Sequence, residues 1–590
     1  MTKEKLSALR AHMQQLGVDA VIVPRADEHL GEYVAARSER LAWLTGFTGS
    51  AGIAAVTASH AAVFSDGRYV LQLANETDAS LWEQLHMVQQ PAATWLVQAG
   101  ARRIGYDPWL IAEDGLKPYI EAGLEMVPLA TNPIDSVWPD QPPPPVAEAV
   151  LHPLTLSGRD SADKRAEVAA TLRTAGHDAA VISDPASIAW LFNIRGGDVP
   201  FAPMALGFAV IDSAGACTLF MDAAKLPQAT RVWLGNQVTL AEPASIRTHM
   251  QQMRGKRVRA DAAAQPAWFA QTLRASGAEV IQGMDPCILP KACKNAVEQQ
   301  GARNAHLRDA VAVSRFLHWF DEQRDASATE ISAAAQLLAF RSKMDGFRGE
   351  SFPAISGSGE HGAIIHYRVS PDSNRSILPD EAYLIDSGAQ YVDGTTDITR
   401  TIWTGPGTQP DVLRDRYTRV LQGHIAIDRL IFPAGLHGSH LDSFARATLW
   451  QAGLDFDHGT GHGVGSYLSV HEGPVSLSRT GRPVPLAPGM ILSNEPGFYE
   501  PGAFGIRLEN LVLVHEQTLP NALKPFLRFE TLSWAPFDRR LIDVARLTEA
   551  ERAWIDSYHA SVCQKLAASL APDTRTWLER SCAPINVKAN

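Results

Sequence analysis

The stretch ILSNEPGFYEPGAFGIRLENLVLV, residues 491–514, carries the acids Glu495 and Glu509 next to its two apolar ends. The two acids are equidistant from Gly502, so a hairpin whose loop is centred on residues 501–503 makes them direct cross-strand neighbours. Like charges at that separation repel each other unless a cation lies between them. The stretch therefore predicts a β-hairpin built around a bound cation.

A second pair of acids, Asp386 and Asp397, lies in YLIDSGAQYVDGTTDITRT, residues 383–401. A carboxylate between apolar residues is costly to bury without a cation or strong hydrogen bonds. The two acids are an odd number of positions apart and would face opposite sides of one continuous strand, but Asp393-Gly394 is a turn signal that lets the chain fold back. We expect two converging strands joined by a wide loop or a bulge near Gly388, in a register that the sequence leaves open.

Three histidines, His458, His462 and His471, lie in HGTGHGVGSYLSVHEGP, residues 458–474. The first two have the spacing of a zinc-binding helix, but four glycines make a helix improbable and no Glu follows His458. The glycines also resemble a phosphate loop, which the missing strand-to-helix context argues against. We expect a glycine-lined wall that lets a peptide backbone approach, with one histidine on a metal and the others reaching the substrate.

The four acids together favour a pair of metal ions. Four carboxylates carry about four negative charges, which two divalent ions would neutralise. Oxygen-rich ligation suits Mn, Mg or Fe(II) better than a structural zinc site, and one imidazole favours a transition metal over Mg.

The chain has 590 residues, which predicts three or four domains. Prolines 142–145 predict a stiff extended linker. On either side of it the sequence repeats: LRAHMQQLGVDAVIV (9–23) resembles LRTAGHDAAVIS (172–183), so we expect two duplicated α/β domains. A third region begins near 290–295 and ends with a capping box, Thr548-x-x-Glu551, ahead of a helix. We expect this helix to pack on its own domain, with a dimer contact as the alternative.

Composition excludes several classes of protein. The net charge of −11 argues against a cationic protein that binds nucleic acid or a membrane surface. Five cysteines without CxxC spacing argue against a disulfide framework or a thiolate zinc site. We find no secretory signal and no apolar stretch long enough to span a bilayer, so we expect a cytoplasmic protein.

These segments resemble the aminopeptidase P branch of the pita-bread metallopeptidases, a family that also includes methionine aminopeptidases, prolidases and creatinases. The resemblance extends over the chain, through FTGSAG and SDGRY in the first domain, IAWLFNIRG in the second, and AIIHY (363–367) with the segments above in the third. It implies an α/β and α+β fold. Two duplicated creatinase-like α/β domains, 1–153 and 154–297, are expected to precede a pita-bread catalytic domain with a C-terminal helical extension, 298–590.

The resemblance also implies a set of site residues. The expected ligands of two divalent metal ions, Mn²⁺ above all, are Asp386, Asp397, His462, Glu495 and Glu509. Glu495, His366 and His471 are the expected catalytic residues. The expected substrate contacts are Arg68, His366, His458, His471, Tyr499 and Arg507.

The implied activity is hydrolysis, by metal-activated hydroxide, of the bond before a proline in the second position of a peptide. A prolidase that cuts Xaa-Pro dipeptides is the alternative within the class. A non-catalytic peptide- or histone-binding module on the same fold is the alternative outside it, which the complete ligand set and the missing acidic tail argue against. The family resemblance further implies a homodimer.

Overall fold

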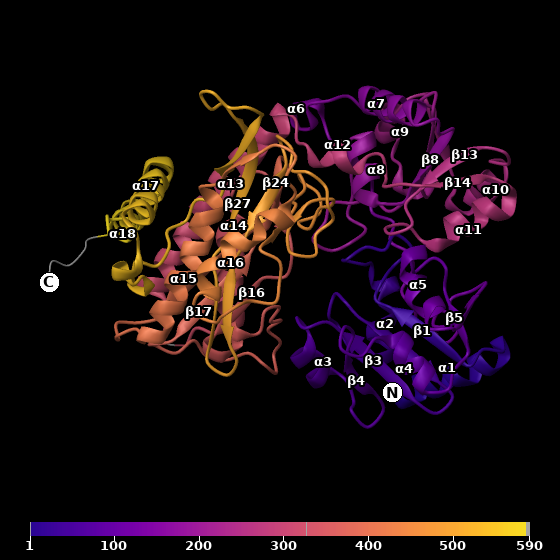
Figure 1. Cartoon of the computed structure of the whole chain (residues 1–590), viewed down its shortest axis with the longest axis horizontal. Helices are drawn as coiled ribbons and strands as arrows, with labels where there is room; N and C mark the ends of the chain where they lie inside the picture. Colours follow the sequence, from indigo (N-terminus) through magenta and orange to yellow (C-terminus); the bar gives the residue numbers. More distant parts are fainter. Residues whose placement is uncertain (1, 326, 586–590) are drawn as a thin grey trace. The chain divides into compact units, whose positions relative to one another are not determined.

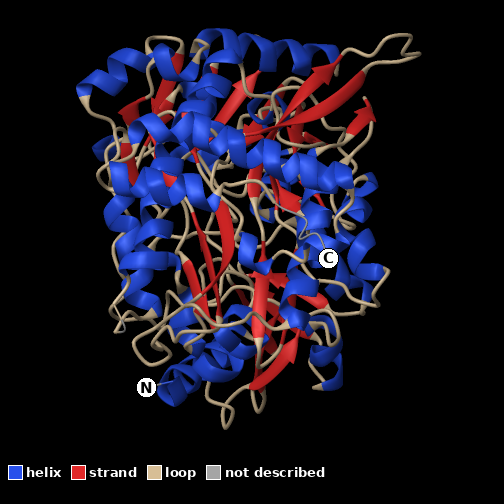
Figure 2. Ribbon diagram, turned by 90° about the vertical axis from the view of Figure 1, so that its left-hand side faces the viewer, coloured by secondary structure: helices blue, strands red, loops and turns tan. Residues whose placement is uncertain are grey.

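The structure is a computed structural model that describes residues 2–325 and 327–585, and helices and strands are interspersed along it (Figures 1 and 2). Contacts divide the chain into two units. The first unit runs up to Leu154 and continues over Arg159–Ile288; the second takes Thr155–Gly158 and continues from Leu289. The domain boundaries at 153 and 297 stay predictions.

The first unit contains two six-stranded mixed sheets with the same topology, β4-β3-β2-β1-β5-β6 and β12-β11-β10-β8-β13-β14. In each sheet the central strand, β1 or β8, is antiparallel to one neighbour and parallel to the other. A helix ends at a left-handed glycine before each central strand, Gly17 (φ 66°) and Gly176 (φ 69°). The repeat in the sequence is therefore a structural duplication, as predicted.

The first sheet and its helices are α1 (Thr2–Leu16), β1 (Ala20–Pro24), α2 (Arg40–Thr45), β2 (Ile53–Thr57), β3 (Ala61–Ser65), α3 (Val70–Glu76), β4 (Glu83–His86), α4 (Ala92–Gln98), β5 (Arg103–Tyr106), α5 (Glu113–Glu121) and β6 (Glu125–Pro128). The second comprises α7 (Ser161–Thr174), β8 (Ala179–Ile182), α8 (Pro185–Phe192), β10 (Phe208–Asp212), β11 (Cys217–Phe220), α9 (Gln228–Leu234), β12 (Val238–Ala241), α10 (Ile246–Gln251), β13 (Arg257–Ala260), α11 (Ala267–Ser276) and β14 (Glu279–Gln282). Short elements are β7 (Val150–Leu151), α6 (Leu154–Ser157), β9 (Ile194–Arg195) and α12 (Ile288–Ala292).

The second unit combines long helices with several small sheets. Its helices are α13 (Ala296–His318), α14 (Glu330–Arg341), α15 (Asp411–Asp428), α16 (Asp442–Trp450), α17 (Glu549–Leu566) and α18 (Pro572–Ser581). Its strands are β15 (Phe347–Glu350), β16 (Ile355–Ser358), β17 (Ala382–Ser387), β18 (Ala389–Tyr391), β19 (Gly394–Thr395), β20 (Ile398–Trp403), β21 (Ile431–Pro433), β22 (Gly461–His462), β23 (Ser476–Leu477), β24 (Ile491–Asn494), β25 (Gly497–Glu500), β26 (Phe504–Arg507), β27 (Asn510–Gln517) and β28 (Phe526–Thr531).

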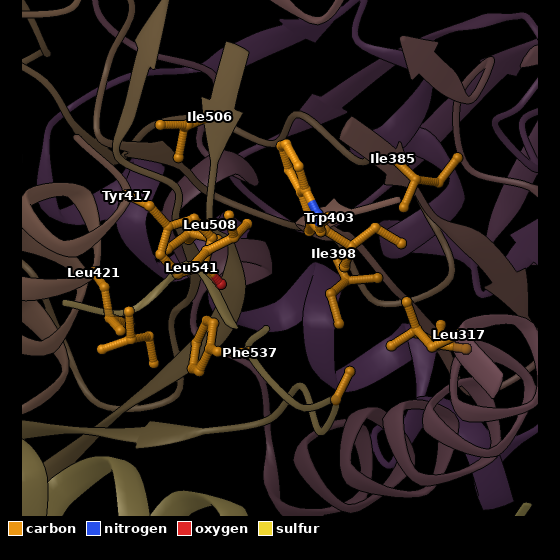
Figure 3. Close-up of a cluster of buried hydrophobic side chains, with 14 of the residues drawn as sticks. Leu317, Ile385, Ile398, Trp403, Tyr417, Leu421, Ile506, Leu508, Phe537 and Leu541 are labelled. Atoms are coloured by element: carbon orange, nitrogen blue, oxygen red, sulfur yellow. The ribbon is translucent and has the colours of Figure 1, made fainter. Parts of the chain in front are cut away.

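One apolar core lies behind the predicted acids. Figure 3 shows side chains from α13, α15, β17, β20 and β26 meeting in it, among them Ile385 and Ile398, which are 4% and 5% exposed. These two residues are the direct neighbours of Asp386 and Asp397. Because successive side chains along extended chain point to opposite sides, the core places both acids on the other side.

Helix α17, which follows the predicted capping box, packs on its own unit, as predicted. Thr548 and Glu551 form the predicted capping box, with Glu551 Oε2 accepting the Thr548 amide at 2.8 Å. Tyr558 and Val562 are buried in the core of this unit. No helix in 2–325 or 327–585 is long and apolar enough to cross a bilayer.

We predict that His559 on α17 makes the protein acid-sensitive. Its Nε2 accepts the amide hydrogen of Phe537 at 3.1 Å, so the folded ring is neutral. Burial, reinforced by Arg539 and Arg400, lowers the pKa of His559 to about 3. The unfolded chain takes up this proton near pH 6.5, so stability falls below that pH by about 1.4 kcal/mol per unit until pH 3.

A glutamine at this position can still accept from Phe537 but does not titrate. Between pH 7 and pH 5 we expect His559→Gln to lose about 2 kcal/mol less unfolding free energy than the parent chain. Denaturant unfolding followed by circular dichroism at both pH values measures the difference. The same pH dependence in both proteins would contradict it.

Candidate metal centre

Glu495 and Glu509 lie opposite each other at a break between two antiparallel ladders. β24 pairs with β27 before the break and β25 pairs with β26 beyond it, in one common register. This is the register that the sequence predicts. At the break the amide of Glu495 donates to Thr460 O at 2.7 Å and that of Glu509 to Thr399 O at 3.1 Å, so each acid is tied to a further segment.

Asp386 lies on β17 and Asp397 directly precedes β20, and these strands pair antiparallel. The residues between them form a hairpin of their own, β18 with β19, whose turn contains Asp393. A Cβ at Gly388, where this hairpin leaves β17, would lie 2.1 Å from Ser351 Oγ. The converging strands, the turn at Asp393 and the special role of Gly388 agree with expectation; the connection is an inserted hairpin, where the sequence predicts a wide loop or a bulge.

Asp397, His462 and Glu509 each present a ligand atom within 4.8 Å of the other two. His462 Nε2 lies 3.6 Å from Asp397 Oδ2 and 3.5 Å from Glu495 Oε1. The opposite ring nitrogen, Nδ1, donates to Gly463 O at 3.0 Å. In the neutral ring the lone pair is therefore on Nε2, which faces the carboxylates.

The four acids are better suited to binding a divalent cation than to lying side by side without one. Asp386 Oδ1, Asp397 Oδ1 and Glu509 Oε1 are buried and have no hydrogen-bond partner among the described residues. Burial, and then the charges of nearby acids, raise the pKa of Asp397 and of Glu509 well above its usual range. Buried oxygens without donors, next to an imidazole lone pair, form a suitable ligand set for a transition metal.

A chain of hydrogen bonds extends from this cluster through the predicted substrate residues. Arg507 Nη2 donates to Asp386 Oδ2 at 2.7 Å, and Arg507 Nη1 donates to Tyr499 Oη at 2.6 Å. The Tyr499 hydroxyl lies 2.8 Å from His458 Nε2, while His458 Nδ1 donates to Gly459 O at 2.8 Å. The Tyr499 hydroxyl therefore donates to His458, which fixes the neutral tautomer.

The other predicted residues are placed less directly. The His471 ring lies 4.3 Å from the His462 ring, edge to face, and is exposed. His366 is half-buried on the loop after the turn Gly359–Ala363. Arg68 belongs to the first unit, where its guanidinium donates to Asp66 at 2.7 Å.

Glu330, which motif spacing does not identify, holds the loop that carries His366. Its side chain is fully buried at the start of α14. Its carboxylate accepts hydrogen bonds from Ser358 N (2.8 Å), His361 Nδ1 (2.9 Å), Tyr367 Oη (2.9 Å) and Arg375 N (3.3 Å). One carboxylate therefore clamps both ends of the loop. The sequence signal that could have pointed to Glu330 is its position directly after the helix cap Thr329.

Arg400 is a second residue that the motif does not identify. It is 1% exposed and donates to Glu509 O at 2.7 Å and to Asn510 Oδ1 at 2.8 Å. Its guanidinium also lies 4.3 Å from the centre of the Phe537 ring. Arg400 thus fixes the main chain of one candidate ligand, although the sequence shows only a basic residue in an apolar strand.

Two glycines of the histidine segment are required by the packing of the chain itself. A Cβ on Gly461 would lie 1.9 Å from Ser493 O, and a Cβ on Gly463 would lie 2.2 Å from Glu472 O. These glycines let neighbouring segments of the chain itself approach. The role expected for the segment, a wall that a substrate backbone can approach, stays a prediction.

Models of known families match most of the chain. The Creatinase/Prolidase N-terminal domain matches residues 5–131 and again 140–298. Metallopeptidase family M24 matches 300–516, and the C-terminal region of that peptidase family matches 525–585.

Full-length relatives carry consistent names. Aminopeptidase P2 of Arabidopsis thaliana is 39% identical over 99% of this chain and 88% of its own length. A probable Xaa-Pro aminopeptidase P of Pyricularia oryzae is 38% identical over 99% of both chains. The crystal structure of X-prolyl aminopeptidase from Caenorhabditis elegans, described as a cytosolic enzyme with a di-nuclear active site, is 32% identical, with a TM-score of 0.93 over 99% of this chain and 100% of that one.

We predict that metal loading stabilises the protein by relieving repulsion among the acids. At free Mn²⁺ one hundred times its Kd, each site adds about 2.7 kcal/mol. Asp397→Asn should melt no lower than the parent chain when both are stripped by chelator, yet gain less from Mn²⁺. Thermal unfolding of both proteins with and without Mn²⁺ measures this, and an equal gain in both would contradict it.

We predict that Glu330→Gln loosens the loop of His366 without altering metal binding, because none of the bonds described for Glu330 reaches a candidate ligand. Limited proteolysis should cut within 359–375 faster than in the parent chain, while Mn²⁺ titration stays unchanged. Glu360→Gln, an exposed change in the same loop, is the matched control. Cleavage at the parent rate in Glu330→Gln would refute the clamp.

Proposed function

The chain belongs to metallopeptidase family M24 and, within it, to the Xaa-Pro aminopeptidases, and we propose that it removes the N-terminal residue from peptides whose second residue is proline. The observation that carries this proposal is the buried cluster of carboxylates with unpartnered oxygens around His462, in a chain whose relatives match it from end to end. Such a cluster is the expected basis of a hydrolytic metal site, and a silent binding module has no need of it.

The proposed ligands of two Mn²⁺ ions are Asp386, Asp397, His462, Glu495 and Glu509. The oxygen-rich donor set supports Mn²⁺, and the imidazole supports a transition metal over Mg²⁺. Two ions balance the four carboxylates, and the Caenorhabditis elegans neighbour is described as di-nuclear. When bound, the ions would lower the pKa of water enough for hydroxide to form near neutral pH.

Glu495 is the proposed proton carrier. It is the least buried of the four acids, with 18% of its side chain exposed, so it can meet both solvent and substrate. Ser493 donates to its Oε1 at 3.0 Å and fixes its orientation. Glu495 would take a proton from the attacking water and pass it to the prolyl nitrogen that leaves.

The histidines are proposed to act on the peptide. His471, exposed beside His462, and His366 would stabilise the oxyanion and orient the scissile bond. A hydrogen-bonded wall next to Asp386 is formed by His458, Tyr499 and Arg507. These three side chains would contact the peptide residues on either side of the scissile bond.

Arg68 is proposed to reach towards the peptide. Proline in the second position has no N–H to donate and has a fixed φ. A dedicated pocket can accept such a residue, whereas peptidases that need a hydrogen-bonding residue at that position cannot.

We further propose a cytoplasmic location, supported by the description of the Caenorhabditis elegans enzyme as cytosolic, and a homodimer, which rests on family resemblance.

We predict metal-dependent cleavage of Arg-Pro-Pro by protein stripped with chelator and reloaded with Mn²⁺, with little cleavage of Arg-Pro or Arg-Ala-Ala. Release of free arginine is the measurement. Preference for the dipeptide would make the protein a prolidase.

Asp397→Asn should lower the rate by about 100-fold or more, because removing a ligand costs at least as much as removing one of its supports. A parent protein that binds peptide but turns over none of the three, with any divalent ion, would sink the enzyme proposal.

A further inference from the structure

Glu472, directly after His471, is a buried carboxylate held by two buried lysines. Glu472, Lys291 and Lys294 are 4%, 3% and 4% exposed. Lys291 Nζ lies 3.2 Å from Glu472 Oε2, and Lys294 Nζ donates to Glu472 Oε1. Three desolvated charges are tolerated only when they pair closely, so the geometry of this cluster is strongly constrained.

Both lysines are anchored to the rest of the second unit. Lys291 lies on α12, whose last residue, Ala292, is buried in an apolar cluster with Leu492 of β24. Lys294 directly precedes the capped start of α13. The amide of Lys294 donates to Gly489 O at 3.0 Å, and the amide of Gly489 donates to Val514 O at the 2.9 Å typical of a sheet bond. The two lysine ammonium groups thus have fixed positions, which determine where the Glu472 carboxylate lies.

The main chain of Glu472 acts on His462. The Glu472 amide donates to Gly463 O at 2.7 Å, and the same oxygen accepts from His462 Nδ1 at 3.0 Å. The Gly463 amide donates to Val475 O, three residues after Glu472, at 3.0 Å. The position of Glu472 therefore sets the position of the carbonyl that orients the His462 ring and keeps the lone pair of Nε2 toward the acids.

We propose that Glu472, clamped by Lys291 and Lys294, is a positioning residue that orients His462 as a metal ligand and sets the place of the adjacent His471. This inference rests on the proposed function, since it assigns a support to a proposed ligand. A carboxylate between two fixed ammonium groups cannot rotate or slide without leaving charges unpaired. An apolar side chain in place of Glu472 would fill the same space without fixing the position of this segment of the chain.

The test is metal binding, measured apart from catalysis. In Glu472→Gln the shape is kept and the charge is lost, and supports of metal-bound histidines contribute 10- to 100-fold to affinity. We therefore expect about a tenfold or greater loss of affinity for one of two Mn²⁺ ions, by calorimetric titration of stripped protein, and a changed absorption spectrum of the Co²⁺-loaded protein. Lys294→Met should act in the same direction, and Lys294→Arg should restore both readouts.

Glu530→Gln is the matched control, because Glu530 is also a carboxylate between two basic groups, Arg303 and His515, none of them a proposed ligand. It should lower thermal stability without altering Mn²⁺ affinity or the Co²⁺ spectrum. If Glu472→Gln or, should that variant fail to fold, Lys294→Met melts lower but titrates like the parent chain, the clamp is structural only and the inference is overturned. A parent chain that binds no Mn²⁺ would instead defeat the proposed function.

Discussion

Mutual repulsion among four carboxylates is the constraint on which the second unit depends. Asp386, Asp397 and Glu509 are buried, and each retains an oxygen without a donor among the residues described. No arrangement of this kind is stable by packing alone, because burial and the charges of the neighbouring acids raise the pKa of Asp397 and of Glu509. The surrounding strands and the buried Arg400, which donates to the main chain of Glu509, hold the acids together against that repulsion.

The core and the acids occupy opposite sides of the same strands. Ile385 and Ile398 enter the apolar cluster while their neighbours Asp386 and Asp397 face the site. The stability contributed by the apolar side thereby fixes the backbone on which the charged side depends. The acids come from two strand pairs, so the centre joins parts of the chain that are far apart in sequence.

Much of this centre could be predicted because strand periodicity is simple. The symmetric spacing of Glu495 and Glu509 about Gly502 gave their register, and the repeat in the first unit gave two sheets of one topology. The inserted hairpin after Gly388 could be predicted only as a wide loop or a bulge, because the contacts that require a glycine there, with Ser351 Oγ and Thr396 O, form only in the folded chain. The roles of Glu330 and Glu472 could not be predicted for the same reason, because their hydrogen-bond partners are distant in the sequence.

Because Glu495 and Glu509 face each other across the hairpin 495–509, the metal centre tolerates some changes in the length of this hairpin and not others. Residues added in pairs at the tip of the hairpin, around Pro501 and Gly502, lengthen both strands and leave Glu495 opposite Glu509. A single residue inserted on one side only, between Glu495 and the tip, would slide one strand against the other and turn a carboxylate out of the cluster. Natural variation in length should therefore gather at the tip of this hairpin and be absent from its sides.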